Sequence, residues 1–302
     1  MKEKGIPFKN SLYASIDDLL SNQEKKDFEK LVGMNHSLAQ TVKQCKATIS
    51  YPPNGLPMLL YGPTGTGKSL IAKLTYEWAR NQGVISKNGQ FVQVNCSEYA
   101  NNPELLTANL FGHVKGAFTG AEKDNEGLIA LADNGVLFLD EVHELKAECQ
   151  EKLFLFMDQG IYHRVGDNEK WYKSNVRIVF ATTENPDKVL LKTLMRRIPM
   201  TITIPSLEQR GTQERIELLH DIFSQEEKRL DCQIKISSKV YNALLQSKMP
   251  GNIGQLKSSV QSCCINSLFD KVNDELVIHL DSLPKDLLQQ VYANQKTVLD
   301  DD

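Results

Sequence analysis

Hydrophobic and polar positions follow two alternating patterns up to about residue 205. Short apolar runs rich in β-branched and aromatic residues predict buried strands over residues 57–61, 91–95, 135–141, 176–182 and 199–204. Between these runs, apolar residues recur at helical spacing, which predicts helices over residues 15–30, 37–49, 70–82, 102–110, 127–132, 145–158 and 190–197. Strands that alternate with helices are typical of an α/β domain built on a parallel sheet.

A different pattern begins after residues 205–211, whose proline, serine, glycine and charged residues mark a domain boundary. Beyond it we expect helices over residues 212–230, 237–246 and 252–269, with a short strand over 275–280, while residues 234–236 are too few to interpret. Residues 160–174 are polar and aromatic and predict a loop. We therefore expect an N-terminal extension (1–27), an α/β domain (28–207), a smaller α-helical domain (208–272) and a C-terminal extension (273–302).

The composition is that of an ordinary globular chain. Of the 302 residues, 41% are hydrophobic and 24% are charged, and the net charge is −3. This balance gives no bulk attraction for nucleic acid, although a local basic patch remains open. The six cysteines lack the spacing of a metal site. Because no run has transmembrane length and the first residues do not resemble a signal peptide, we expect a cytoplasmic protein.

The first candidate site joins the predicted strand 57–61 to the helix that follows it. The segment fits the phosphate-binding pattern G-x-x-x-x-G-K-[ST] at every fixed position, with Gly62, Pro63, Thr64, Gly65, Thr66, Gly67, Lys68 and Ser69. Glycines allow backbone N–H groups to turn toward phosphate oxygens, and the helix N-terminus adds partial positive charge. Lys68 is expected to reach the outer phosphates and Ser69 to bind Mg²⁺. The segment therefore predicts binding of a nucleoside triphosphate.

A pair of acids, Asp140 and Glu141, ends the predicted strand 135–141. Ligands of parallel α/β sheets bind at the carboxyl ends of the strands. Taken alone the pair is weak evidence, since many strands end in solvated acids. Together with the phosphate loop, it predicts that Asp140 holds Mg²⁺ through water and that Glu141 activates an attacking water. We therefore expect hydrolysis of the nucleotide.

A second distinctive segment is a loop formed by Gly116, Ala117, Phe118, Thr119, Gly120 and Ala121. Its composition allows two interpretations. Phe118 either folds back into the core or is offered to another protein, where an aromatic anchor contributes strongly to binding.

This six-residue segment resembles the GAFTGA signature of bacterial sigma-54-dependent transcription activators, which are AAA+ ATPases. Further motifs in the same order are also similar to that family, from about residue 28 to 269. The resemblance implies an AAA+ α/β domain followed by a helical lid, and a ring oligomer, usually a hexamer, that hydrolyses ATP between subunits. Residues 116–121 would then grip sigma-54 and remodel its closed promoter complex, with promoter DNA contacted only indirectly or through domains outside this chain.

The resemblance also implies roles for single residues. Asn95 resembles the residue that holds the catalytic glutamate inactive, and Thr182 resembles a sensor of the γ-phosphate, although Thr183 stands where the family often has asparagine. Val32 and Gly33 resemble the hinge beside the adenine. Residues 160–174 resemble a second surface loop that moves with the first.

The family pattern has arginines at the finger, at a position upstream of it and in the lid, and this sequence matches only the first. Arg196 and Arg197 resemble the position of an arginine finger, the cation that a neighbouring subunit offers to the transition state, and the sequence does not distinguish which of them acts. A second arginine, found upstream in many relatives, is missing. Gly254 occupies a lid position where most members have an arginine that contacts the nucleotide. The sequence around Gly254 is similar to that of the LevR-type branch, whose members regulate sugar-phosphotransferase operons.

The leading hypothesis is therefore an ATP-hydrolysing activator of sigma-54 RNA polymerase. Gly254 and the missing arginine motivate an alternative, a nucleotide-gated module that binds sigma-54 with little turnover. A general AAA+ protein remodeller would explain the phosphate loop but not the segment 116–121.

Overall fold

The computed structural model describes residues 6–7, 27–271 and 274–299. Most of the predicted helix 15–30 and of the N-terminal extension lies outside this range, and the described part, Asp27–Lys30, is a 3₁₀ helix, η2. The described residues form two compact units. The first, here the α/β unit, holds residues 27–63 and 67–204, and the second, here the C-terminal unit, holds residues 6–7, 64–66 and those from 205 onward.

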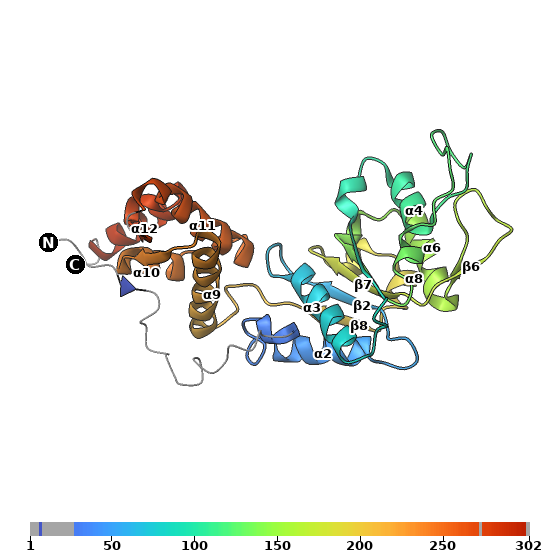
Figure 1. Cartoon of the computed structure of the whole chain (residues 1–302), viewed down its shortest axis with the longest axis horizontal. Coiled ribbons are helices and arrows are strands. Elements are labelled where there is room, and N and C mark those ends of the chain that lie inside the picture. The colour runs from blue at the N-terminus through green and yellow to red at the C-terminus, as the bar shows by residue number, and fades with distance from the viewer. Residues whose placement is uncertain (1–5, 8–26, 272–273, 300–302) are drawn as a thin grey trace. The chain divides into compact units, whose positions relative to one another are not determined.

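The α/β unit is built on a five-stranded sheet with the order β3-β4-β7-β2-β8. Figure 1 labels β7, β2 and β8 of this sheet. All neighbouring strands run parallel. The strands are β2 (Met58–Tyr61), β3 (Phe91–Asn95), β4 (Val136–Asp140), β7 (Arg177–Thr182) and β8 (Met200–Thr203). All five strands predicted from apolar runs are confirmed. The three inner strands, β4, β7 and β2, are buried on both faces, and such strands read as continuous apolar segments.

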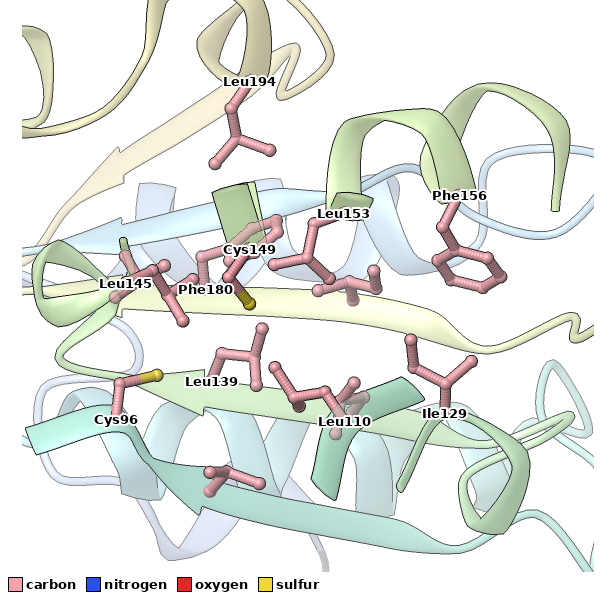
Figure 2. Packing of buried hydrophobic residues seen from close by; sticks show 14 of the residues in the cluster. Cys96, Leu110, Ile129, Leu139, Leu145, Cys149, Leu153, Phe156, Phe180 and Leu194 are labelled. Carbon is pink, nitrogen blue, oxygen red and sulfur yellow. The ribbon is translucent and has the colours of Figure 1, made fainter. Parts of the chain in front are cut away.

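Alternate residues of the central strands belong to two separate cores, one on each face of the sheet. One core contains Leu59, Leu137, Leu139, Ile178 and Phe180. The other contains Met58, Leu60, Val136, Phe138, Val179 and Ala181. Figure 2 shows the first core, in which Leu139 and Phe180 of the sheet lie with Leu153 and Phe156 of a helix.

Helices cover both faces and make the unit a three-layer sandwich. The first core is closed by α4 (Pro103–Phe111), α6 (Ala147–Gln159) and α8 (Lys192–Met195), and the second by α2 (Ala39–Ile49) and α3 (Lys68–Asn81). The shorter helices are α5 (Leu128–Leu131) and α7 (Pro186–Val189), with the 3₁₀ turns η3 (Cys96–Tyr99) and η4 (Val142–Glu144). The helix expected over 190–197 is therefore shorter than predicted and follows a separate α7.

The segment 160–174, predicted as a loop, contains a small hairpin. Strands β5 (Ile161–Tyr162) and β6 (Tyr172–Lys173) pair in antiparallel fashion. Strands of two residues carry no periodicity that a sequence pattern could detect. The pairing is stabilised by ring contacts, since Tyr162 lies 5.9 Å from Tyr172 and 5.7 Å from Phe156 between ring centroids.

The C-terminal unit is mainly helical but also contains a sheet. Its helices are α9 (Thr212–Leu230), α10 (Ser238–Gln246), α11 (Asn252–Asn266) and α12 (Lys285–Leu299), with the 3₁₀ turns η5 (Leu268–Asp270) and η6 (Leu280–Ser282). Strand β9 (Gln233–Ile236) lies between β1 (Ile6–Pro7), which is antiparallel to it, and the parallel β10 (Glu275–Ile278).

Residues 234–236, which the sequence left open between the predicted helices, belong to β9. Ile234 and Ile236 are buried there while Gln233 is exposed, a strand alternation too short to identify without its distant partner. The strand expected over 275–280 is confirmed as β10. Within the described part of the chain, no helix is both long enough and apolar enough to span a membrane.

Candidate nucleotide-binding site

The phosphate loop lies between β2 and α3, as its sequence predicts. Gly67 has a φ of 99° and Gly65 a φ of 75°, a left-handed backbone that favours glycine. Lys68 begins α3 and is buried, and its Nζ donates to the carbonyl oxygens of Gly62 at 2.8 Å and Pro63 at 3.2 Å. These two hydrogen bonds hold the start of the loop in its curved conformation.

The charge of Lys68 is set by opposing influences. Burial lowers the pKa of its ammonium group, while the nearby carboxylates of Glu141 and Asp140 act to raise it. All three residues come from adjacent parts of one sheet edge. The net lowering shows that burial outweighs these two anions, and a phosphate beside the ammonium group would favour its charged form.

Ser69 and Asp140 are in direct contact. The Ser69 hydroxyl donates to Asp140 Oδ2 at 2.8 Å, and Asp140 Oδ1 accepts the backbone N–H of Glu141 at 3.0 Å. A hydroxyl oxygen and a carboxylate oxygen side by side are ligands that Mg²⁺ prefers. This donor set fits the cation predicted for the two residues.

Glu141 has a backbone φ of 49°, which is uncommon for a residue with a side chain. Its carboxylate oxygen Oε2 accepts the Thr183 hydroxyl at 3.0 Å and lies 3.4 Å from Nδ1 of His143. Thr183 follows β7 and His143 lies in η4, so two elements beyond β4 hold this carboxylate. Sequence analysis missed both contacts: the one from Thr183 depends on the adjacency of β4 and β7, which are far apart along the chain, and the one from His143 on the turn that η4 makes directly after β4.

The side chain of Asn95 has a different set of partners. Asn95 ends β3 opposite Asp140 in the register, and its Oδ1 accepts the backbone N–H of Ser97 at 3.1 Å and the Ser97 hydroxyl at 2.8 Å. It thereby caps η3. Thr182 ends β7 beside Tyr61 of β2 and is fully buried. Phosphate loop, acids and both threonines therefore gather at the carboxyl ends of β2, β4 and β7.

The two candidate finger residues differ sharply. Arg197 donates to Asp158 from Nη2 at 2.7 Å and from Nε at 2.9 Å, and its guanidinium lies 4.9 Å from the ring centroid of Phe154. This hydrogen bonding lowers the pKa of the Asp158 carboxyl. Arg196 is the exposed C-cap of α8, and its side chain makes no hydrogen bond or ion pair with a described residue.

The loop 116–121 is closed by its own backbone. Gly116 N–H donates to Ala121 O at 2.9 Å, and Ala121 N–H donates to Phe118 O at 3.0 Å. Phe118 is 39% exposed and contacts the His113 ring at 4.9 Å between centroids, and it belongs to neither core of the α/β unit. The segment before the loop pairs with the hairpin region, since Val114 N–H donates to Val165 O at 3.1 Å.

The hinge candidates lie in turns that follow η2. Gly33 is buried with a φ of 87°, and its carbonyl oxygen accepts the N–H groups of His36 and Leu38, both at 3.0 Å. Val32 is half-buried next to it. The left-handed φ accounts for the glycine at position 33 without reference to a ligand.

The tip of the phosphate loop, residues 64–66, belongs to the C-terminal unit. There the Asn252 side chain donates to Thr64 O at 2.8 Å, and Gly254 N–H donates to Gly65 O at 3.1 Å. A Cβ on Gly65 would lie 2.1 Å from the Gly251 carbonyl oxygen, so the two backbones approach more closely than any other residue would allow.

Solved structures share this architecture. NtrX from Brucella abortus in complex with ADP has a TM-score of 0.68 at 26% identity, over 84% of this chain and 54% of that one. The structure of NtrX in complex with ATP has a TM-score of 0.71 at 24% identity, over 91% and 57%, and supports the fold. The sheet, the phosphate loop and the strand-end acids define an α/β domain of the AAA+ class.

The sequence then assigns the family. Residues 31–202 match the Sigma-54 interaction domain. The chain is 45% identical over 272 residues to the transcriptional regulatory protein LevR of Bacillus subtilis (strain 168), which covers 89% of this chain and 29% of that protein. It is 41% identical over 256 residues to DagR of Salmonella typhimurium (strain 14028s / SGSC 2262), covering 83% and 27%. The chain belongs to the sigma-54 interaction domain family, in its LevR-type branch, and spans less than a third of these two relatives.

Proposed function

We propose that this chain is the motor domain of a sigma-54-dependent transcription activator, which hydrolyses ATP to remodel the polymerase at a promoter. The observation that carries the proposal is the meeting of Lys68, the Ser69–Asp140 pair and Glu141 at one sheet edge, in a member of this family. Residues 28–207 would form the AAA+ α/β domain and residues 208–272 the lid.

Each residue has a role that follows from its contacts. Lys68 would exchange its two carbonyl partners for the outer phosphates of ATP, and N–H groups of residues 64–69 would cradle them. Ser69 and Asp140 would hold Mg²⁺, which supplies charge neutralisation at the phosphates. Glu141 would orient and deprotonate the attacking water, and Thr182 would sense the outer phosphate.

The arginine finger would be Arg196. A finger must reach the ATP of a neighbouring subunit, and Arg196 is exposed while Arg197 is engaged by Asp158. A finger supplied from another subunit implies a ring, for which we propose a hexamer in the cytoplasm. Phe118, exposed on the loop 116–121, would contact sigma-54 and transmit the work of hydrolysis.

The decisive experiment combines sigma-54 binding with steady-state hydrolysis. We expect the chain to bind sigma-54 in the presence of ADP and aluminium fluoride, a mimic of the transition state, and not with ADP alone. Phe118→Ala should abolish this binding and retain hydrolysis. Glu141→Gln should bind ATP and lose turnover by about a hundredfold or more. Sigma-54 binding that survives in Phe118→Ala would contradict the role of the loop.

A nucleotide-gated module with little turnover is the second candidate, and Gly254 favours it. A glycine offers no side chain to an ATP phosphate, so the C-terminal unit lacks an arginine contact at this position. Specific activity measured over a range of protein concentrations separates the two. A motor with a finger in trans becomes more active per subunit as the ring assembles, whereas a gated module stays inactive at every concentration.

A further inference from the structure

The imidazole of His143 lies between the two groups that the proposed reaction must coordinate. Its Nδ1 is 3.1 Å from the Thr182 hydroxyl oxygen and 3.4 Å from Oε2 of Glu141. On the far side of the ring, Nε2 is 3.6 Å from Oε1 of Glu144. The His143 side chain is 18% exposed and Thr182 is fully buried, so this arrangement is largely protected from solvent.

The hydrogen-bond capacity of these groups allows two arrangements. The Thr182 hydroxyl has one proton, and its oxygen already accepts the backbone N–H of Glu184 at 3.1 Å. When the hydroxyl proton points to Nδ1, that nitrogen accepts and carries no proton, and Nε2–H faces Glu144. When the hydroxyl proton points instead to Glu184 O, 3.4 Å away, Nδ1 can carry the proton, with the Thr182 oxygen at 3.1 Å and Oε2 of Glu141 at 3.4 Å as its acceptors. In each tautomer the protonated nitrogen therefore has a carboxylate oxygen within 3.6 Å.

We propose that His143 is a positioning residue that couples what Thr182 binds to the orientation of the Glu141 carboxylate. The inference rests on the proposed function, in which Thr182 senses the outer phosphate. A phosphate oxygen that accepts the Thr182 proton removes the donor to Nδ1. The proton on Nε2 then leaves to solvent and one from solvent enters at Nδ1, so the net charge of the ring is unchanged. The new Nδ1–H fixes Oε2 of Glu141.

Thr183 gives Glu141 a second hydrogen-bond partner. Its hydroxyl donates to the same Oε2 at 3.0 Å, so Glu141 keeps one partner when His143 is replaced. Loss of His143 should therefore impair the orientation of Glu141 without abolishing the reaction. Asn95, whose Oδ1 is taken by Ser97, contributes to neither contact through that oxygen.

The direct test is the tautomer of His143 in the full chain, read from the ¹⁵N chemical shifts of its ring. The sequence contains six histidines, and the His143→Asn spectrum identifies the signal. We expect Nε2–H without nucleotide and with ADP, and Nδ1–H with ADP and aluminium fluoride. An unchanged tautomer in the last state would overturn the proposal, even if hydrolysis is normal.

The kinetic test uses three substitutions at one position. His143→Ala and His143→Gln should lower kcat by about tenfold to a hundredfold, the loss expected from a displaced catalytic group, with KM for ATP within twofold of the original. His143→Asn, whose amide N–H lies near the place of Nδ1, should restore part of kcat. Equal loss in all three variants, or a loss confined to KM, would refute the coupling. Absent turnover in the unmodified chain would instead refute the proposed function, and the tautomer could still be measured.

Discussion

Two adjacent arginines, Arg196 and Arg197, have different contacts. At the scale of single residues, we therefore expect one of them to affect catalysis and the other to affect stability. Arg197 joins α8 to α6 through Asp158 and Phe154. Arg196, one position earlier, has no such tie within the described residues. Sequence reasoning placed both at the finger position and had no means to choose between them, because the choice depends on a partner 39 residues away.

We therefore expect opposite effects of two matched substitutions. Arg196→Ala should lower specific ATPase activity by orders of magnitude, since a finger stabilises charge in the transition state, and should leave Tm unchanged. Arg197→Ala should lower Tm slightly, because its ion pair is largely exposed, and should leave activity near normal at a temperature where it is folded. Asp158→Asn is the control and should resemble Arg197→Ala. The assignment fails if Arg197→Ala is the variant that loses activity.

At the scale of elements, the central strands can be predicted from their own sequence, while the shortest strands form only through pairing with other segments of the chain. β4 and β7 each place alternate residues in two cores, and their continuous apolar character identifies them. β5 and β6, with two residues each, are too short to show a period. For the same reason the phosphate loop was predictable from local sequence, whereas the contact of Thr183 with Glu141 was not, because it arises only when β4 and β7 pair.

The burial of two phenylalanines of the α/β unit predicts that their replacement will have very different effects on the free energy of unfolding. Phe180 on β7 is fully buried in the first core, so Phe180→Ala should reduce the free energy of unfolding by about 3–5 kcal/mol. Phe118→Ala, on the exposed loop, should change it by less than about 0.5 kcal/mol. Both tryptophans of the chain, Trp78 and Trp171, lie in the α/β unit, so their fluorescence in urea reports its unfolding. A similar effect of the two substitutions would contradict the burial described here.

At the scale of the whole molecule, the chain crosses between its two compact units at the phosphate loop, since residues 64–66 are grouped with the C-terminal unit. Asn252 is central to that grouping. Its side chain accepts the N–H of Leu207 at 2.8 Å and donates to Thr64 O at 2.8 Å, and its own φ is 55°. One buried amide thus ties the start of the C-terminal unit to the tip of the loop.

Asn252→Gly tests this tie, because glycine accepts the left-handed backbone and removes only the amide. The buried N–H of Leu207 would lose its partner, at a cost of about 1–3 kcal/mol in stability. We expect faster hydrogen exchange at Leu207 and weaker binding of ATP, measured by calorimetry. Ser258→Gly, later in the same helix, is a control for the general effect of glycine in α11. If both variants bind ATP equally well, Asn252 does not shape the loop.

The contacts of Lys68 have a consequence for how a nucleotide binds and for the conformational entropy that its binding costs. Its ammonium group occupies the mouth of the loop by donating to Gly62 and Pro63, so the backbone is already curved before a ligand arrives. A preformed site loses little conformational entropy on binding, which favours affinity. The rearrangement on arrival is then the release of one side chain from two carbonyl oxygens, a fast motion, so binding of a nucleotide should not require refolding of this part of the loop.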